Sequence, residues 1–128
     1  MYLQEVAESI PFLGARRESM HQQKIQHIKT YLAEQFNLPD EQIEMLLPSF
    51  IATLDIHMQN LENALEEKNL ASIGEVGHTI KGAFLNLGLQ DCASIALRIE
   101  ERGKAGDHDT NFEQLVEDLR REISPVLE

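Results

Sequence analysis

The sequence EVGHTIKGAFLNLG, residues 75–88, combines helix-forming residues with three glycines. A fourth glycine, Gly74, stands directly before it. Each glycine in the interior of a helix costs about 1 kcal/mol relative to alanine. A segment that keeps this many glycines needs a reason other than helix stability, and the histidine and lysine among them suggest one.

A helical wheel predicts which residues of this segment face water. Measured from the apolar residue Ile73 at about 100° per residue, His78 lies at roughly 140° and points away from the predicted core. On this wheel Gly74, Gly82 and Leu85 lie within roughly 40° of His78, and Lys81 lies within roughly 60°. The solvent face of this helix is therefore predicted to hold an exposed imidazole with small residues one turn before and one turn after it.

Glycine on a water-facing surface has a different use from glycine in a core. Core packing does not require glycine there, whereas the close approach of another molecule does. We therefore predict that Gly74, Gly82 and Leu85 belong to a surface on which a partner reaches His78. Gly77 leans toward the core instead, where close helix packing explains it.

Amphipathic patterns continue on both sides of this segment. Apolar residues at i, i+3, i+4 spacing predict helices over residues 20–36, 40–67, 70–87, 90–102 and 109–127. Pro48 predicts a kink or a split in the second helix, Asn69 is suited to an N-cap, and Gly88 is suited to a helix end.

The short connections between these helices predict their arrangement. Sequential helices joined by short loops become antiparallel neighbours, so the four helices from residue 40 onward predict an all-α, antiparallel up-down four-helix bundle. The helix at residues 20–36 is expected to pack on one end or side as an additional N-terminal helix. We assign residues 20–128 to the bundle and residues 1–19 to an N-terminal extension.

Composition narrows the class of protein. The chain has 128 residues, no tryptophan and a net charge of −11, which suits one helical domain and argues against a nucleic-acid partner. No apolar run is long enough for a membrane span, and the first residues lack the basic region of a secretory signal. The single cysteine, Cys92, lies on a core stripe and fits a reducing compartment. We therefore predict a cytoplasmic protein with no membrane partner.

The chemistry of this face points to an anion. A neutral imidazole has a free ring nitrogen that acts as a nucleophile, and Lys81 supplies a positive charge beside it. A phosphoryl group carried on His78 is the natural candidate, because the lysine would offset its charge. No second acid or base is evident on this face, Glu75 being one turn away. The sequence also lacks a HExxH motif, a Cys/His cluster, a P-loop and a kinase signature, so it predicts neither a metal site nor ATP chemistry.

The segment HTIKGAFLNLG resembles the signature of histidine-containing phosphotransfer (HPt) domains, a His-x-x-Lys-Gly core followed by a second glycine six residues after the first. Residues 50–82 are similar to the family's second helix, its turn and the entry into the phosphorylated helix, and IALRIEERGKAGD, residues 95–107, to the helix and loop that follow. The sequence departs from the family at Gly77, where alanine is frequent, and at Ala83, where serine is frequent.

The resemblance implies a carrier in a two-component phosphorelay. His78 would accept a phosphoryl group on Nε2 from a receiver-domain aspartate and pass it to another receiver. Lys81 would be the stabilising cation and Gly82 the residue that gives clearance. The chain would not be an enzyme with its own kinase activity, and it would bind no cofactor, since the receiver supplies Mg²⁺. The implied partners are response-regulator receiver domains, a hybrid histidine kinase, or both.

Two alternatives stay open at this point. The same surface could bind a receiver or kinase as a scaffold without being phosphorylated. The chain could also be the phosphorylated domain of a larger chemotaxis-type histidine kinase.

Overall fold

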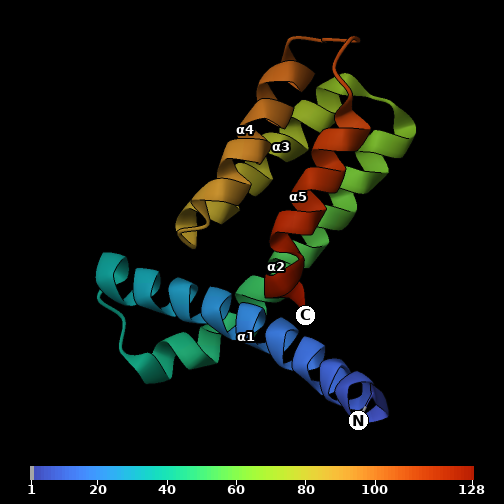
Figure 1. Cartoon of the computed structure of the whole chain (residues 1–128). Helices are drawn as coiled ribbons and strands as arrows, with labels where there is room; N and C mark the ends of the chain where they lie inside the picture. The colour runs from blue at the N-terminus through green and yellow to red at the C-terminus, as the bar shows by residue number, and fades with distance from the viewer. Residues whose placement is uncertain (1) are drawn as a thin grey trace.

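A computed structural model shows a chain built from helices (Figure 1). It describes residues 19–128 throughout, and for residues 2–18 it gives only the extent of the first helix. The five helices are α1 (Tyr2–Phe36), α2 (Asp40–Glu67), α3 (Leu70–Asn86), α4 (Gln90–Lys104) and α5 (Phe112–Leu127). The described part of the chain contains no strand, which confirms the all-α prediction.

The helix ends follow local capping chemistry. Asn69 caps α3 as predicted, because its side chain accepts a hydrogen bond from the Ser72 backbone N–H at 3.2 Å. Gly88 follows α3 with a positive φ of 74°, the left-handed conformation in which glycine ends helices.

Two boundaries differ from the prediction at the end of the chain. α4 continues to Lys104 rather than residue 102, and α5 begins at Phe112 rather than residue 109. The later start of α5 has a local cause, since Asp107 accepts hydrogen bonds from Thr110 and from the Asp109 backbone and holds these residues in a turn. Asn111 then caps α5 by accepting from the Gln114 backbone N–H.

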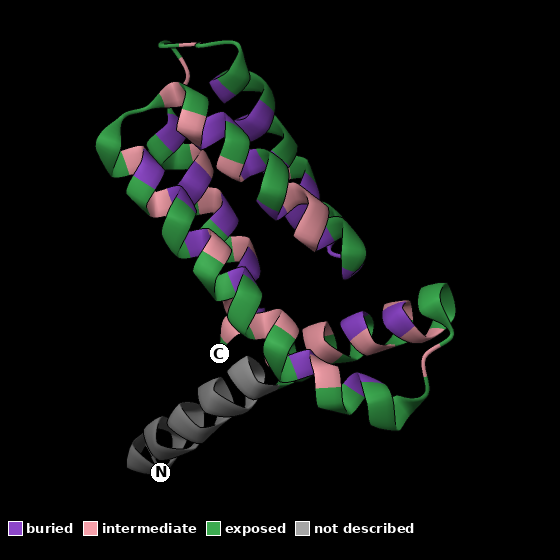
Figure 2. Cartoon of the chain, turned by 180° about the vertical axis from the view of Figure 1, so that it is seen from behind, coloured by how far each residue is buried: buried purple, intermediate pink, exposed green. Residues whose placement is uncertain are grey.

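Helices α2 to α5 lie side by side, and each packs against two of the others (Figure 1). α3 contacts α2 and α4, and α5 contacts the same two helices, so the four surround a common core. Buried residues face inward along each of them (Figure 2). The largest fully buried side chains of these four helices are Phe84, Ile43, Leu54, Met58, Leu61, Ile73, Ile80, Ile99, Leu119, Ile123 and Val126. Cys92 belongs to this core as predicted, and burial raises the pKa of its thiol to about 12.

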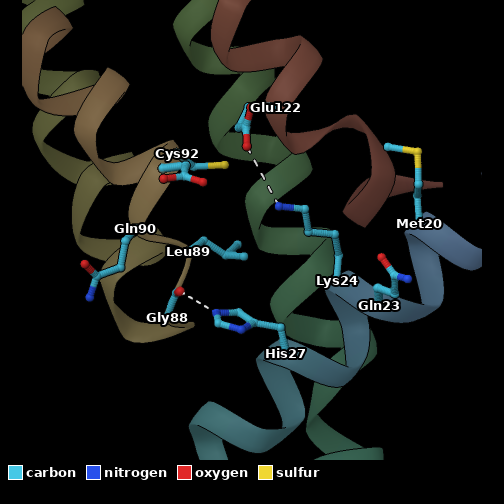
Figure 3. Close-up of a pocket in the computed structure, with 10 residues that line it drawn as sticks. Met20, Gln23, Lys24, His27, Gly88, Leu89, Gln90, Cys92 and Glu122 are labelled. Carbon is cyan, nitrogen blue, oxygen red and sulfur yellow. Dashed lines mark hydrogen bonds and ion pairs between the residues drawn. The ribbon is translucent and has the colours of Figure 1, made fainter.

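Helix α1 lies across one end of this group of helices (Figure 1). It contacts α2 and α5 and buries Ile28 and Leu32, which confirms that the N-terminal helix packs on one end. His27 Nε2 lies 2.8 Å from the Gly88 carbonyl oxygen, and Lys24 forms an ion pair with Glu122 at 3.8 Å (Figure 3). These polar contacts, at the edge of a small cavity that does not contain His78, attach α1 to the α3–α4 turn and to α5. α1 begins at Tyr2 rather than at residue 20, so it includes most of the predicted extension, residues 1–19, whose side chains before Ser19 lie outside the described residues.

Pro48 lies inside α2, as predicted, and the helix continues through it. Figure 1 shows α2 changing direction where it passes α1, and a proline inside a helix removes one backbone hydrogen bond and favours such a bend. The first turns of α2 therefore lie beside α1, while the rest runs along α3 and α5. None of the described helices is long and apolar enough to cross a membrane.

Candidate functional site

The site centres on His78, which α3 presents on its outer face. The His78 side chain is 61% exposed, so a second molecule can reach the ring. Its Nδ1 lies 2.6 Å from Oε1 of Glu100, a residue of the neighbouring helix α4. One ring nitrogen is therefore held by the protein, and the other, Nε2, is free to face a partner.

Glu100 is the buried charge of the site, with 7% of its surface exposed. Besides His78 it contacts two lysines: Lys81 Nζ lies 2.6 Å from its Oε2, and Lys104 Nζ lies 3.1 Å from its Oε1. The hydrogen bond from Lys81, followed by those from Lys104 and His78, lowers the pKa of the Glu100 carboxyl to about 2, although burial acts in the opposite direction. Glu100 is therefore ionised at neutral pH and fully paired.

The ionised carboxylate fixes the proton on the imidazole. A carboxylate only accepts hydrogen bonds, so the Nδ1 of His78 must be the donor in the contact with Glu100. In a neutral imidazole the proton then sits on Nδ1, and Nε2 carries the lone pair. The contact thus selects the tautomer in which the exposed nitrogen is the nucleophilic one.

The prediction for Gly74 is wrong, because Gly74 is buried against α4 and is not part of the exposed surface. A Cβ on Gly74 would lie 2.8 Å from the backbone N of Lys104, so this glycine serves helix–helix packing. The helical wheel placed Gly74 on the same face as His78, but a wheel does not show which part of that face a neighbouring helix covers. Here α4 covers Gly74. Gly77 is buried as predicted, and a Cβ there would lie 2.9 Å from the backbone N of Glu100.

Gly82 and Leu85 lie where the sequence placed them. A Cβ on Gly82 would meet no atom within 4 Å, so the surface one turn after His78 is open. Leu85 is 46% exposed one turn further on. Lys81 is only 22% exposed, because it turns toward Glu100 instead of extending into solvent.

An apolar groove begins beside Gly82 and extends across three helices. It has a volume of 990 Å³. Its lining residues are Leu32, Phe36 and Leu38 from α1 and the loop after it, Ser49, Phe50, Thr53, Leu54 and His57 from α2, and Thr79, Gly82, Ala83, Asn86 and Leu87 from α3 and its end. Thr79 and Gly82 are the first and fourth residues after His78, so the groove begins next to His78 on α3, while Glu100 lies on α4 and does not line it.

Sequence reasoning missed Glu100 and Lys104. Glu100 follows His78 by 22 positions, and the two residues meet only because α3 and α4 pack as antiparallel neighbours. An available signal was the position of Glu100 on the same stripe of its helix as Ala93 and Ala96, all three of which are buried. A charged residue on such a stripe needs a partner of opposite charge. Among the described residues no group of His, Cys, Asp and Glu side chains could hold a metal ion.

The model of the Hpt domain family matches residues 45–124, which is more than half of the chain. Searches of the curated proteins and of the solved structures found no match. The matched range includes His78, Lys81, Glu100 and Lys104, and the resemblance inferred from HTIKGAFLNLG is confirmed. The chain belongs to the Hpt domain family.

Proposed function

We propose that this protein is a histidine phosphotransfer protein of a multistep phosphorelay, which accepts a phosphoryl group on His78 from a receiver-domain aspartate and passes it to another receiver. The observation that carries the proposal is the exposed imidazole whose Nδ1 is held by the buried Glu100 carboxylate. We also infer that α2 to α5 form the antiparallel up-down four-helix bundle of the family, and the ring of pairwise helix contacts supports this inference.

The transfer begins with the Nε2 lone pair of His78. Nε2 attacks the phosphorus of the aspartyl phosphate, the Nε2–P bond forms, and the P–O bond to the aspartate breaks. The aspartate leaves as a carboxylate with the bonding electron pair. The ring keeps its proton on Nδ1 and becomes positively charged, so no proton has to be removed during the attack. Glu100 stabilises this charge through the Nδ1 hydrogen bond. Reversal of the same step delivers the phosphoryl group to the next receiver.

Two lysines would offset the charge of the phosphoryl group. Lys81 contacts Oε2 of Glu100, and Lys104 contacts Oε1, the oxygen that also accepts from His78. The arriving phosphoryl oxygens compete with the Glu100 carboxylate for these ammonium groups, which have three donors each. Lys104 is thus a second cation, besides Lys81, that would offset the phosphoryl charge. Glu100 keeps the two lysines near the ring before the phosphoryl group is present.

The partner is expected to dock over the apolar groove beside Gly82. This side supports docking because Nε2 faces away from Glu100 and because the groove borders Thr79 and Gly82. Leu85, exposed on the same helix, adds an apolar contact at the edge of the groove. An apolar centre next to a polar reacting group suits a transient complex of modest area.

The remaining chemistry is assigned to the partners. The chain is proposed to be a phosphoryl carrier with no kinase activity of its own, and Mg²⁺ would bind in the acidic pocket of the receiver. Response-regulator receiver domains, a hybrid histidine kinase, or both are the proposed partners. We propose a cytoplasmic location, which is where these partners carry their phosphorylated aspartates.

The test is transfer from a phosphorylated receiver domain in the presence of Mg²⁺. Intact mass should show one added phosphoryl group that is labile in acid and stable in base, as expected for a phosphoramidate bond. The label should be absent from His78→Gln, and His108→Gln, which changes an exposed histidine outside the site, should keep it. No label from any of a panel of receivers, in a protein that still binds them, would favour the scaffold alternative.

A further inference from the structure

Three glycines form a seam between α3 and α4, directly behind the site. Gly74 and Gly77 lie on α3, and Gly103 lies on α4. A Cβ on Gly103 would lie 2.6 Å from the backbone N and 2.7 Å from the Cα of Gly74. These neighbours are backbone atoms, which cannot rotate away as the end of a side chain can. The two helices therefore approach to a distance at which no side chain fits between them.

The same seam touches the backbone of Glu100, which contacts His78, and of Lys104, which contacts Glu100. A Cβ on Gly77 would lie 2.9 Å from the N and 3.2 Å from the Cα of Glu100. A Cβ on Gly74 would lie 2.8 Å from the N of Lys104. The backbone positions of Glu100 and Lys104 are thus set by the absence of side chains on α3. The Glu100 side chain then reaches His78 and Lys81 across this short separation, and Lys104 contacts Glu100 from the same helix.

From these contacts we infer that Gly77 and Gly103 are positioning residues, which hold Glu100 close enough to His78 to fix the proton on Nδ1 and leave the lone pair on Nε2. The consequence for phosphoryl transfer rests on the proposed function, whereas the consequence for the imidazole tautomer does not. This role differs from that of Gly82, which faces open space and contacts neither Glu100 nor Lys104.

The geometry explains why a small displacement matters. A hydrogen bond of 2.6 Å to an ionised carboxylate is short, and such bonds weaken steeply with distance and angle. An added Cβ at Gly103 forces the two backbones apart, and the Glu100 carboxylate moves with α4. An imidazole without this partner favours the opposite tautomer, with the proton on Nε2. The nucleophilic nitrogen would then carry a proton that has to be removed before attack.

Gly103→Ala is the sharpest variant, because it leaves the sequence around His78 untouched. Any change in the tautomer of His78 must then result from a change in the distance between α3 and α4. The measurement is a long-range ¹H–¹⁵N NMR spectrum of the full chain, with His78→Gln used to assign the His78 ring signals. We expect Nε2 of the unchanged protein to resonate as an unprotonated nitrogen. In Gly103→Ala the ratio of the Nδ1–H to the Nε2–H tautomer should fall about tenfold, since the hydrogen bond to the ionised carboxylate is weakened.

Gly82→Ala is the matched control. It places the same methyl group on α3, closer to His78 in sequence, but in open space. The tautomer ratio of this variant should equal that of the unchanged protein. Gly77→Ala is the second test variant and should shift the ratio in the same direction as Gly103→Ala. Backbone amide spectra identify the variants that keep the fold.

The outcomes separate this inference from the proposed function. A folded Gly103→Ala or Gly77→Ala variant with an unchanged tautomer ratio would overturn the inference, even if the unchanged protein accepts phosphate. Loss of the fold in both variants would also overturn it, because the seam would then serve stability alone. If the tautomer ratio shifts in Gly103→Ala but no receiver phosphorylates the unchanged protein, the positioning role of the glycines is supported and the proposed function is contradicted. If both the inference and the proposed function hold, phosphoryl transfer to Gly103→Ala should be slower than to the unchanged protein. The tautomer ratio of Gly82→Ala should equal that of the unchanged protein.

Discussion

His78 depends on a carboxylate from another helix. An isolated surface histidine has two tautomers and no fixed direction, whereas here the Glu100 contact at 2.6 Å gives the ring one orientation and one protonation pattern. Glu100 in turn is held by Lys81 and Lys104. These four side chains act as a unit, so the effects of changing them should not be additive.

The low pKa of Glu100 makes a prediction about stability. The folded-state pKa of about 2 lies below the ordinary value of 4.5, so the ionised carboxylate stabilises the folded protein above about pH 4.5. This contribution is lost as the pH falls toward 2. Glu100→Gln should therefore lower the free energy of unfolding by roughly 1–2 kcal/mol at pH 7, a value reduced for solvent screening.

Urea unfolding of both proteins from pH 7 to pH 3 checks this prediction. The difference between the unchanged protein and Glu100→Gln should shrink by more than half over this range. A difference that stays constant with pH would show that the charge of Glu100 is not its cause, and that lost packing is.

Lys81 should matter more to transfer than Lys104 does. Lys81 is the less exposed of the two, at 22% against 52%, and makes the shorter contact with Glu100. Lys81→Ala should slow phosphoryl transfer about tenfold, because a preorganised cation is lost from the phosphoryl site, and should leave the fold intact. Lys104→Ala should have a smaller effect. Single-turnover transfer rates measure both, and equal effects would contradict the ranking.

At the scale of the element, α3 has two faces with different demands on glycine. Gly74 and Gly77 allow α4 to approach, and Gly82 leaves the outer face open. One residue type therefore serves helix packing on one face and, in the proposed function, partner access on the other. Only the position of α4 distinguishes these roles.

Gly82→Leu should block docking without harming the fold. Leucine replaces glycine in a helix favourably, and the added side chain meets no atom of the protein near its Cβ. The midpoint of urea unfolding should therefore stay the same or rise, while transfer from a receiver falls about a hundredfold because the partner loses contact with the groove.

A small phosphoramidate donor separates docking from chemistry in this variant. It reaches Nε2 without a docking surface, so Gly82→Leu should accept phosphate from it at close to the rate of the unchanged protein. Receiver transfer at the unchanged rate in Gly82→Leu would remove the argument that Gly82 provides clearance.

At the scale of the whole molecule, the groove exists because three helices meet beside the site. α1 provides Phe36, α2 provides Phe50, and α3 provides Ala83 and Gly82. α1 reaches this place by crossing the end of the other helices, where His27 and Tyr31 contact Gly88. The proposed docking surface is thus a property of the assembled fold and of no single helix.

Phe36→Ala should weaken receiver binding about tenfold, the effect of losing roughly 1.4 kcal/mol of contact. Met20→Ala is the matched control, since Met20 is also on α1 and equally exposed, at 53%, but lies outside the groove. Titration of each variant with a receiver domain gives the dissociation constants. Equal constants for Phe36→Ala and Met20→Ala would place the docking surface elsewhere.

Gly88 should be important for the packing of α1 against the α3–α4 turn, and therefore for stability. Its φ of 74° disfavours any side chain, and a Cβ would lie 2.4 Å from Cγ of the Tyr31 ring. Gly88→Ala should destabilise the protein by about 2–3 kcal/mol, because strain and displacement of Tyr31 add. Gly106→Ala is the control, since Gly106 has a similar φ of 65° in open space and should lose only the part due to strain. Urea unfolding compares the two, and equal losses would show that the Tyr31 contact contributes nothing.

The helices α2 to α5 and the pairing of His78 with Lys81 on one helix face could be predicted from the sequence. Apolar spacing in α2 to α5 is a local pattern with the period of a helix, Asn69 and Gly88 mark ends through their own backbone chemistry, and His78 and Lys81 share one face one turn apart. Which helix covers each face of α3 depends on how α2 and α4 pack against it, and this could not be read from the pattern of α3. The tertiary structure placed Gly74 in the α3–α4 seam instead of on the predicted docking surface, and it brought Glu100, which Lys104 contacts, to His78 from 22 positions away. A helical wheel gives only the directions of side chains around one helix axis. The distance to a neighbouring helix depends on the side chains of both helices. Here the glycines Gly74, Gly77 and Gly103 make that distance short.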